Sequence, residues 1–151
     1  MQAKSLFNPS KLSIADFRLL KGQVEASEEF APDYIHGHNV ETSFELGFNL
    51  EEKLVRADLT VKIITDSRGR NKQEAQGIFQ FVYIFKVENL EELSIPNPKG
   101  LMIVDPGLGS AIASVSYSTA RGVLITRLQG TAMQGFILPV IDAASLLLDR
   151  S

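Results

Sequence analysis

The sequence of 151 residues contains no cysteine, so disulfide bonds, thiolate chemistry and cysteine-ligated zinc sites are all excluded. No apolar run approaches the roughly 20 residues that a membrane-spanning helix needs. The first ten residues hold no apolar run of seven or more, and we therefore expect no secretory signal. Lysine and arginine do not cluster and the net charge is −3, which argues against a nucleic-acid partner. These absences predict a cytoplasmic protein that neither inserts into membranes nor binds nucleic acid.

Signatures of catalysis are equally scarce. No serine lies in a Gly-x-Ser-x-Gly elbow, and the two histidines, His36 and His38, are the only imidazole bases. Together with Asp33 they form three potential metal ligands in one loop, but without a fourth ligand we interpret them as solvated loop residues. Residues 107–110 open a helix but lack the lysine of a phosphate-binding loop. We expect a protein that is not an enzyme and needs neither metal nor nucleotide cofactor. Two carboxylates paired in a cleft are the enzymatic alternative.

Alternating hydrophobicity is what the sequence does contain. Over residues 40–50 the even positions are apolar or threonine and the odd positions are polar or glycine, which predicts a strand with one dry face. Residues 55–63 alternate in the same way, and the polar residues between the two segments fit a hairpin turn. Residues 73–87 are apolar on both faces at their centre, so we expect both faces to be covered. Self-association as a dimer or tetramer is the simplest way to cover the second face.

A weaker strand precedes these three. Over residues 14–26 the apolar positions change parity between Leu19 and Leu20, which predicts a bulge or a bend. Residues 27–38 carry few strand signals and are interpreted as a long loop of functional importance. Residues 1–12 are interpreted as a flexible N-terminal segment and residues 13–151 as a single domain, because a chain of this length can bury a substantial core.

Helical patterns follow the strands. Residues 88–93 fit one helical turn. Apolar residues at helical spacing predict a long helix from Pro106 to Leu128, with Gly130 as its C-terminal cap. A second, shorter helix is predicted over residues 139–149. The predicted fold class is therefore α+β, with a four-stranded antiparallel sheet followed by a long helix and a shorter C-terminal helix packed on one face.

Three motifs in the C-terminal half, together with this order of elements, resemble the SecB family of protein-export chaperones. The motifs are Tyr117-Ser118-Thr119-Ala120-Arg121, Gly130-Thr131-Ala132-Met133-Gln134 and Leu138-Pro139-Val140. In that family four antiparallel strands precede a long helix with a Tyr-x-Ala-Arg-like stretch. A Gly-Thr or Gly-Gly step and an Ala-Pro-Val segment follow at similar spacing. The likeness covers roughly residues 13–148.

The resemblance implies a function. SecB proteins are tetramers, dimers of dimers, that hold unfolded precursor chains in apolar grooves and deliver them to the SecA motor. It therefore implies a chaperone for non-native polypeptide clients. In the export chaperones SecA docks on acidic residues of the exposed sheet face. This sequence has Glu25 at one such position but Lys21 and Ile78 at two others, so the resemblance implies SecA docking less directly than polypeptide binding.

A polypeptide-binding groove needs accessible apolar side chains with adaptable shapes. The candidates are Phe30, Tyr34, Phe44, Phe48, Phe79, Phe81, Met102, Met133 and Phe136. A competing interpretation of the row Phe79, Phe81, Tyr83 and Phe85 is that it forms the core beneath the long helix. The alternative hypothesis for function is a binding module of the same fold that serves one partner, such as an antitoxin, or a small apolar ligand, without SecA coupling.

Overall fold

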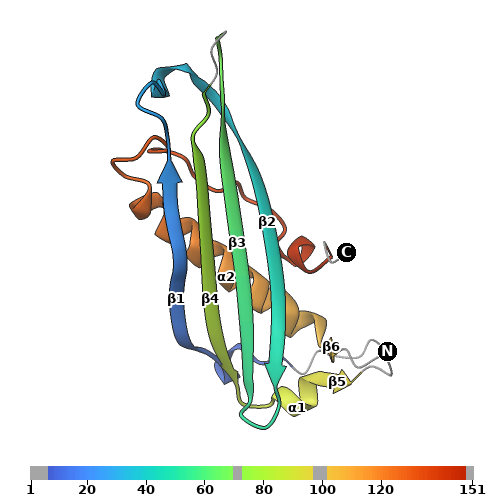
Figure 1. Ribbon diagram of the computed structural model, residues 1–151. Coiled ribbons are helices and arrows are strands. Elements are labelled where there is room, and N and C mark those ends of the chain that lie inside the picture. Colours follow the sequence, from blue (N-terminus) through green and yellow to red (C-terminus); the bar gives the residue numbers. More distant parts are fainter. Residues whose placement is uncertain (1–6, 70–72, 97–101, 149–151) are drawn as a thin grey trace.

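The computed structural model describes residues 7–69, 73–96 and 102–148 (Figure 1). Its main feature is an antiparallel sheet of four strands in the order β1-β4-β3-β2, formed by β1 (Leu12–Glu25), β2 (Ile35–Asn49), β3 (Leu54–Ser67) and β4 (Gln76–Val87). Strands β2, β3 and β4 are sequential neighbours, whereas β1 lies beside β4 after a long connection, which is a Greek-key arrangement. The predicted four-stranded antiparallel sheet is confirmed.

The period of two in the sequence determines which face of each strand is buried. In β3 the alternate residues Val55, Ala57, Leu59, Val61 and Ile63 are fully buried. Their register partners in β2 and β4 point to the same side and extend the apolar face across the sheet. The predicted hairpin between β2 and β3 turns at residues 50–53, where Lys53 takes a positive φ of 60°.

Strand β1 contains two register shifts against β4, between Ile14 and Asp16 and between Leu19 and Lys21. The second shift is the bulge that the change of parity in the sequence predicts. The predicted loop over residues 27–38 is too long, because β2 already begins at Ile35 and its first residues pair with the end of β3. Backbone pairing with a neighbouring strand outweighs the weak strand propensity of Gly37.

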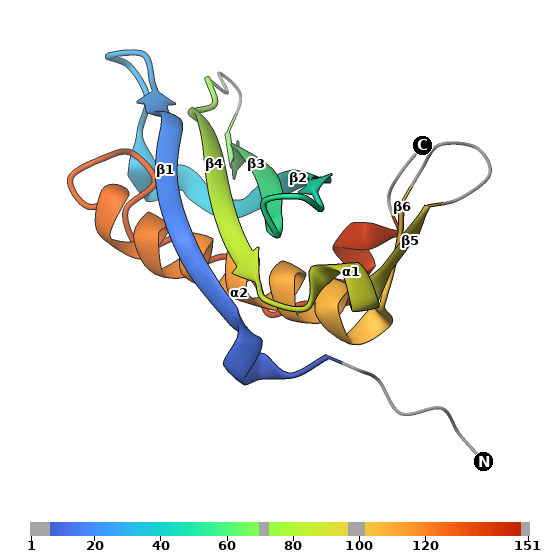
Figure 2. The same ribbon diagram turned by 90° about the horizontal axis from the view of Figure 1, so that it is seen from below.

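Helix α2 (Pro106–Arg127) crosses one face of the sheet (Figure 2). Asp105 caps its N-terminus, since the carboxylate accepts hydrogen bonds from the backbone N–H groups of Gly107 and Leu108 at 2.9 and 3.3 Å. Beyond the helix, Gly130 takes the positive φ of 76° that favours glycine after a helix end. At the interface with the sheet, the buried Tyr83 hydroxyl donates a 2.7 Å hydrogen bond to the carbonyl oxygen of Ser116. The predicted long helix is confirmed.

Short elements complete the fold, namely η1 (Pro9–Lys11), η2 (Pro32–Tyr34), α1 (Leu90–Leu93), β5 (Ser94–Pro96), β6 (Met102–Val104) and η3 (Ala143–Leu147). The C-terminal helix is therefore present, but as a short 3₁₀ helix rather than over the whole of residues 139–149. Asp142 caps it by accepting a hydrogen bond from the Ala144 N–H at 3.1 Å. Of the predicted flexible segment, residues 1–6 lie outside the described residues, while η1 and the start of β1 occupy its end.

The core lies between the sheet and α2. Phe79, Phe81, Tyr83 and Phe85 are buried there against apolar residues of α2 such as Ile112 and Leu124, so the competing interpretation of this aromatic row is correct. The opposite face of the sheet, which Figure 1 turns toward the viewer, is not crossed by any helix of the described chain. We call it the open face. None of the helices within the described ranges combines the length and hydropathy that crossing a membrane requires.

Candidate functional site

A hollow of about 390 Å³ lies at one end of the sheet. One wall comes from η2 and the start of β2, and the other from the loop of residues 131–137 that follows α2. We call this hollow the groove; it is lined by Pro32, Ile35, His38, Thr131, Ala132, Gln134, Gly135, Phe136 and Ile137. Among the described residues the lining contains no aspartate, glutamate, lysine or arginine side chain, which suits an uncharged ligand.

Backbone hydrogen bonds fix the first wall. The N–H of Tyr34 donates to the carbonyl oxygen of Ala31 at 3.1 Å and closes the short turn of η2. The N–H of Arg68 donates to the carbonyl oxygen of Tyr34 at 2.8 Å and ties this turn to the end of β3. Ile35 then pairs with Ser67 and begins β2. The connection between β1 and β2 is therefore held against the sheet at its C-terminal end, where β2 begins.

The second wall is a compact loop closed by its own polar groups. The Thr131 hydroxyl donates to the carbonyl oxygen of Leu128 at 2.7 Å and accepts from the Met133 N–H at 3.1 Å. The Gln134 side chain accepts from the Gly130 N–H at 2.8 Å. Gly135 has a φ of 89°, a conformation that favours glycine, and lets the chain turn outward to Phe136.

Met133 anchors this loop in the core. Its side chain is almost completely buried and lies directly over Gly77 of β4. A Cβ atom at position 77 would come within 3.0 Å of the Met133 sulfur, so glycine is what allows the loop to approach the strand this closely. The contact fixes the height of the second wall above the sheet.

Tyr117 and Arg121 of α2 fasten the other end of the loop. The Tyr117 hydroxyl donates to the carbonyl oxygen of Pro139 at 2.6 Å, and the Arg121 Nε donates to that of Leu138 at 3.1 Å. The Arg121 guanidinium also lies 5.2 Å from the centre of the Tyr117 ring. Two of the sequence motifs, Tyr117 to Arg121 and Leu138 to Val140, are therefore joined directly in space.

His38 and Phe136 meet across the groove, with their ring centroids 4.7 Å apart and their planes tilted by 42°. Burial lowers the pKa of the His38 imidazole, so the ring is neutral at pH 7. Its Nε2 atom is buried without a hydrogen-bond partner among the described residues. The interpretation of both histidines as solvated loop residues is wrong for His38, which faces the core side of β2. His36 is exposed to solvent as expected, but it lies in β2 rather than in a loop, with its Nε2 atom 3.2 Å from the Asp66 carboxylate.

Four of the nine candidate side chains belong to this region. Phe136 lines the groove, and Met133 lies behind it in the core. Tyr34 is 60% exposed in η2, next to the lining residue Ile35. Phe30, in the same connection, packs partly buried against the core. These four residues come from the connection between β1 and β2 and from the segment that follows α2.

The other five candidates lie elsewhere. Phe44, Phe79 and Phe81 are buried in the core, because their strand parity turns them toward α2, and the structure does not bring them to the surface of the groove. Phe48 pairs with Val55 close to the β2–β3 turn, at the end of β2 away from the groove. Met102 lies in β6. These five are not brought together with Phe136.

Sequence reasoning missed several residues of the site. His38 has the same parity as Val40, Thr42 and Phe44, so extending that alternation backward by one step places it on the dry face. Pro32, Ala132 and Ile137 gave no periodic signal because they lie in short connections. Beyond the groove, Val140 is almost fully exposed, and the apolar run around it is a signal for an accessible apolar surface.

The sheet order, the crossing helix and the groove together define the chain as one with the SecB-like fold. No family model matches the sequence, and no curated protein matches it. Among solved structures it is similar to the Mycobacterium tuberculosis Rv1957 SecB-like chaperone in complex with a ChAD peptide from the Rv1956 HigA1 antitoxin. That match has a TM-score of 0.62 and 14% identity and covers 87% of this chain and 91% of the other. A Streptococcus agalactiae protein of unknown function matches with a TM-score of 0.31 and 10% identity, over 85% of this chain and 97% of the other.

Proposed function

We propose that this protein is a cytoplasmic SecB-like chaperone that binds segments of non-native polypeptide in the groove, without nucleotide or metal. The groove itself is the observation that carries the proposal, because its described lining joins the apolar Ile35, Phe136 and Ile137 to polar groups that are uncharged at neutral pH. Ile137 of its lining is exposed, and Tyr34 and Val140 are exposed on the same two segments of the chain. Such a surface suits the side chains that an unfolded protein exposes and a folded one buries.

The size of the groove sets the expected strength of binding. A hollow of about 390 Å³ holds one or two large apolar side chains. Burying each of them contributes about 2 kcal/mol, so a single groove binds a client with a dissociation constant on the order of 1 mM. Useful retention of a client then depends on several grooves acting on one chain, which raises the effective affinity without new contacts.

Self-association as a dimer or tetramer is therefore part of the proposal. The edge strand β1 supports it, since its outer backbone has no neighbouring strand within the described chain. Phe17 on this strand stays partly exposed while its ring packs against those of Phe81 and Tyr83, at centroid distances of 6.2 and 5.2 Å. Pairing of two copies along β1 would cover Phe17 and satisfy the free backbone groups.

A second candidate function is a module dedicated to one partner. The structural similarity to a chaperone that holds an antitoxin peptide favours it. SecA docking is not included in either candidate, because Lys21 and Ile78 stand where acidic residues are expected. Broad capture of unfolded chains in a pull-down would favour the general chaperone, and capture of one protein would favour the dedicated module.

The test uses a matched pair of exposed isoleucines. Ile137 lines the groove and is 57% exposed, whereas Ile103 in β6 is 54% exposed and lies outside it. We expect the unaltered protein to suppress light scattering by a diluted, chemically denatured client at stoichiometric ratios. Ile137→Glu should abolish this suppression and Ile103→Glu should retain it. Equal behaviour of the two variants, or no suppression by the unaltered protein, would overturn the proposal.

A further inference from the structure

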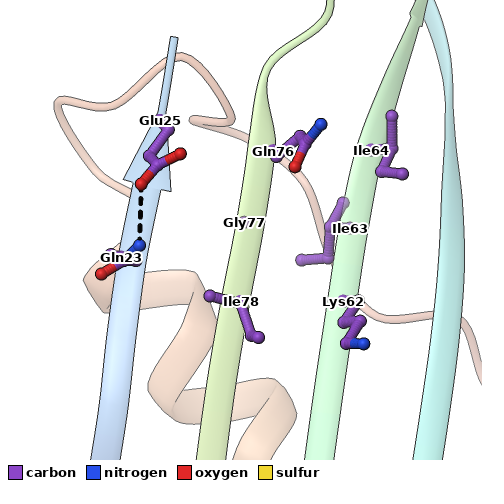
Figure 3. A pocket seen from close by; sticks show the side chains of 8 residues that line it. All are labelled: Gln23, Glu25, Lys62, Ile63, Ile64, Gln76, Gly77 and Ile78. Carbon is purple, nitrogen blue, oxygen red and sulfur yellow. Dashed lines mark hydrogen bonds between the residues drawn. The ribbon is translucent and has the colours of Figure 1, made fainter.

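The groove and a hollow on the open face differ in how their polar side chains meet solvent. The hollow on the open face has a volume of about 270 Å³, and its polar lining residues are Gln23, Glu25, Lys62 and Gln76 (Figure 3). All four are exposed, and Glu25 accepts a 2.9 Å hydrogen bond from the Gln23 side chain. In the groove, by contrast, the Nε2 atom of His38 is buried and has no hydrogen-bond partner among the described residues. A proton taken up by this nitrogen would therefore enter a position that solvent does not reach.

The His38 ring is enclosed from two sides. On the strand side its register partner is Thr65, whose hydroxyl accepts a 2.9 Å hydrogen bond from the Ala75 N–H and donates to the Ala75 carbonyl oxygen at 3.4 Å. On the groove side the Phe136 ring lies against it, with the ring centroids 4.7 Å apart. Phe136 is half-buried, and the residues on either side of it are exposed. The Phe136 ring is therefore the part of the enclosure that can move without disturbing the core.

No counter-ion lies beside the His38 ring, because no carboxylate oxygen of the described residues comes within 4.0 Å of its nitrogens. The loop of residues 131–137 contains no ionisable side chain, and those of the other surrounding elements are His36 and Glu41 of β2, Asp66 of β3, Asp33 and Tyr34 of η2, and Glu74 before β4. Glu41, Asp33 and Tyr34 are exposed, and the Asp66 carboxylate lies 3.2 Å from His36. The Glu74 carboxylate accepts a 3.0 Å hydrogen bond from the Ser67 N–H, and β3 lies between it and β2.

We propose that His38 is a proton-operated switch, which opens the groove in acid and releases a bound client segment. In the closed state the neutral ring packs against Phe136. A proton on Nε2 would create a buried charge without a counter-ion, which costs far more than a buried neutral nitrogen. Outward rotation of the Phe136 side chain lets water reach the charge and removes one wall of the groove. This inference rests on the proposed function, since it concerns the regulation of the same site.

The direction of the pH dependence follows from burial. Burial lowers the pKa of the His38 imidazole, so the closed groove resists the proton and the open groove accepts it. The client segment packs against the closed wall and therefore binds the neutral form. Its affinity is constant above the pKa of the folded protein and falls below it, by no more than about tenfold per pH unit because one proton is involved. By reciprocity, a bound client must lower the pKa of His38 further.

The first experiment uses the protein without a client. The sequence has two histidines, so the ring signals of His36 and His38 can be followed separately by NMR between about pH 7.5 and 5. We expect the backbone amide signals of residues 134–137 to shift together with the His38 ring signal, because Phe136 moves when the ring is protonated. The His36→Gln variant assigns the remaining ring signal and should give the same curve. Addition of a client peptide should move this curve to lower pH.

The second experiment measures client binding at both ends of this pH range. The client is the capped peptide acetyl-Gly-Ser-Phe-Ser-Leu-Ser-Gly-amide, which has no ionisable group of its own. We expect its dissociation constant to be at least about threefold larger at pH 5 than at pH 7.5. His38→Gln cannot take up the proton and should give the same dissociation constant at both pH values, whatever its size. His36→Gln is the matched control and should keep the full pH dependence.

Three outcomes would overturn the switch. They are amide signals of residues 134–137 that stay fixed while the His38 ring titrates, a His38→Gln protein with the pH dependence of the unaltered one, and loss of that dependence in His36→Gln. The first of these needs no altered protein, so it decides the matter even if His38→Gln does not fold. Equal peptide binding at both pH values would overturn the release step and leave the proposed function standing. Absence of binding at pH 7.5 would overturn the proposed function itself, and the release step with it.

Discussion

The Tyr117 hydroxyl donates a 2.6 Å hydrogen bond to the carbonyl oxygen of Pro139, 22 residues further along the chain. This bond joins the middle of α2 to the segment that leaves the groove. The Pro139 carbonyl also accepts a longer bond from Arg121, at 3.4 Å. The segment that leaves the groove is thus held by two polar side chains, one turn apart on α2, and does not form a helix itself.

Removal of this hydroxyl should weaken both the fold and the groove. We expect Tyr117→Phe to lower the free energy of unfolding by about 1 kcal/mol, the usual net contribution of one hydrogen bond. Urea denaturation measures the change. Tyr34→Phe is the matched control, because this tyrosine is largely exposed and should change stability by less than about 0.5 kcal/mol. A Tyr117→Phe protein as stable as the control would show that the Pro139 contact does not hold the segment.

Replacement by alanine should change the stability of the protein in opposite directions at two glycines. At Gly77 an added Cβ would meet the Met133 sulfur at 3.0 Å and the Phe79 ring at 3.2 Å, so Gly77→Ala should destabilise the protein by about 1–3 kcal/mol. At Gly122, within α2, no heavy atom of the described residues lies within 4 Å of the added Cβ, apart from its chain neighbours and the backbone of its own helix. Gly122→Ala should therefore stabilise the protein by about 0.5–1 kcal/mol through its higher helix propensity. Thermal unfolding of both variants checks the contrast, and a stable Gly77→Ala protein would mean that the Met133 loop shifts freely.

Acid should weaken the packing around His38. Burial lowers the pKa of this imidazole in the folded protein below the usual value of about 6.5 for an exposed histidine. The unfolded chain therefore binds the proton more readily, and stability present above about pH 6.5 is lost as the pH falls through the folded pKa. Chemical denaturation between about pH 7.5 and 5 should show this loss, and His38→Gln should remove that part of it. His36→Gln, at the exposed neighbour, should leave the pH-dependent loss of stability unchanged. If His36→Gln removed this loss and His38→Gln did not, His36 rather than His38 would be its cause.

The mass in solution tests the assembly proposed for β1. We expect light scattering to give the mass of a dimer or tetramer of the 16.6 kDa chain. Phe17→Glu should shift the mass toward the monomer, because it places a charge on the edge where two copies would meet. Ile103→Glu serves again as the remote control. A monomeric mass for the unaltered protein would remove self-association from the proposal.

Much of the fold was predictable because it follows from local patterns. The alternation over residues 40–50 and 55–63 defines two strands and their buried faces, and the parity change near Leu19 reveals a bulge. Pro106 and Gly130 mark the two ends of the long helix. These signals depend on neighbours in sequence, which is why a single sequence is enough to predict them.

The groove was only partly predictable because its two walls lie about 100 residues apart in sequence. Pattern reasoning identified each wall as apolar and irregular but could not show that His38 meets Phe136. The C-terminal helix was predicted too long for a related reason. The carbonyl groups of Leu138 and Pro139 bond to Arg121 and Tyr117 instead of continuing a helical ladder. Such competition between local and distant partners is decided only by the folded structure.

The loop of residues 131–137 is fastened at both ends, by Met133 in the core and by the carbonyls that α2 holds. Only the residues from Gln134 to Ile137 lie between these two attachments. A short rim with fixed ends can tilt its side chains toward apolar groups of different shapes while the core beneath it stays unchanged. The ability to bind clients of different sequence would then depend on these four residues. A search for variants with altered client preference can be confined to them.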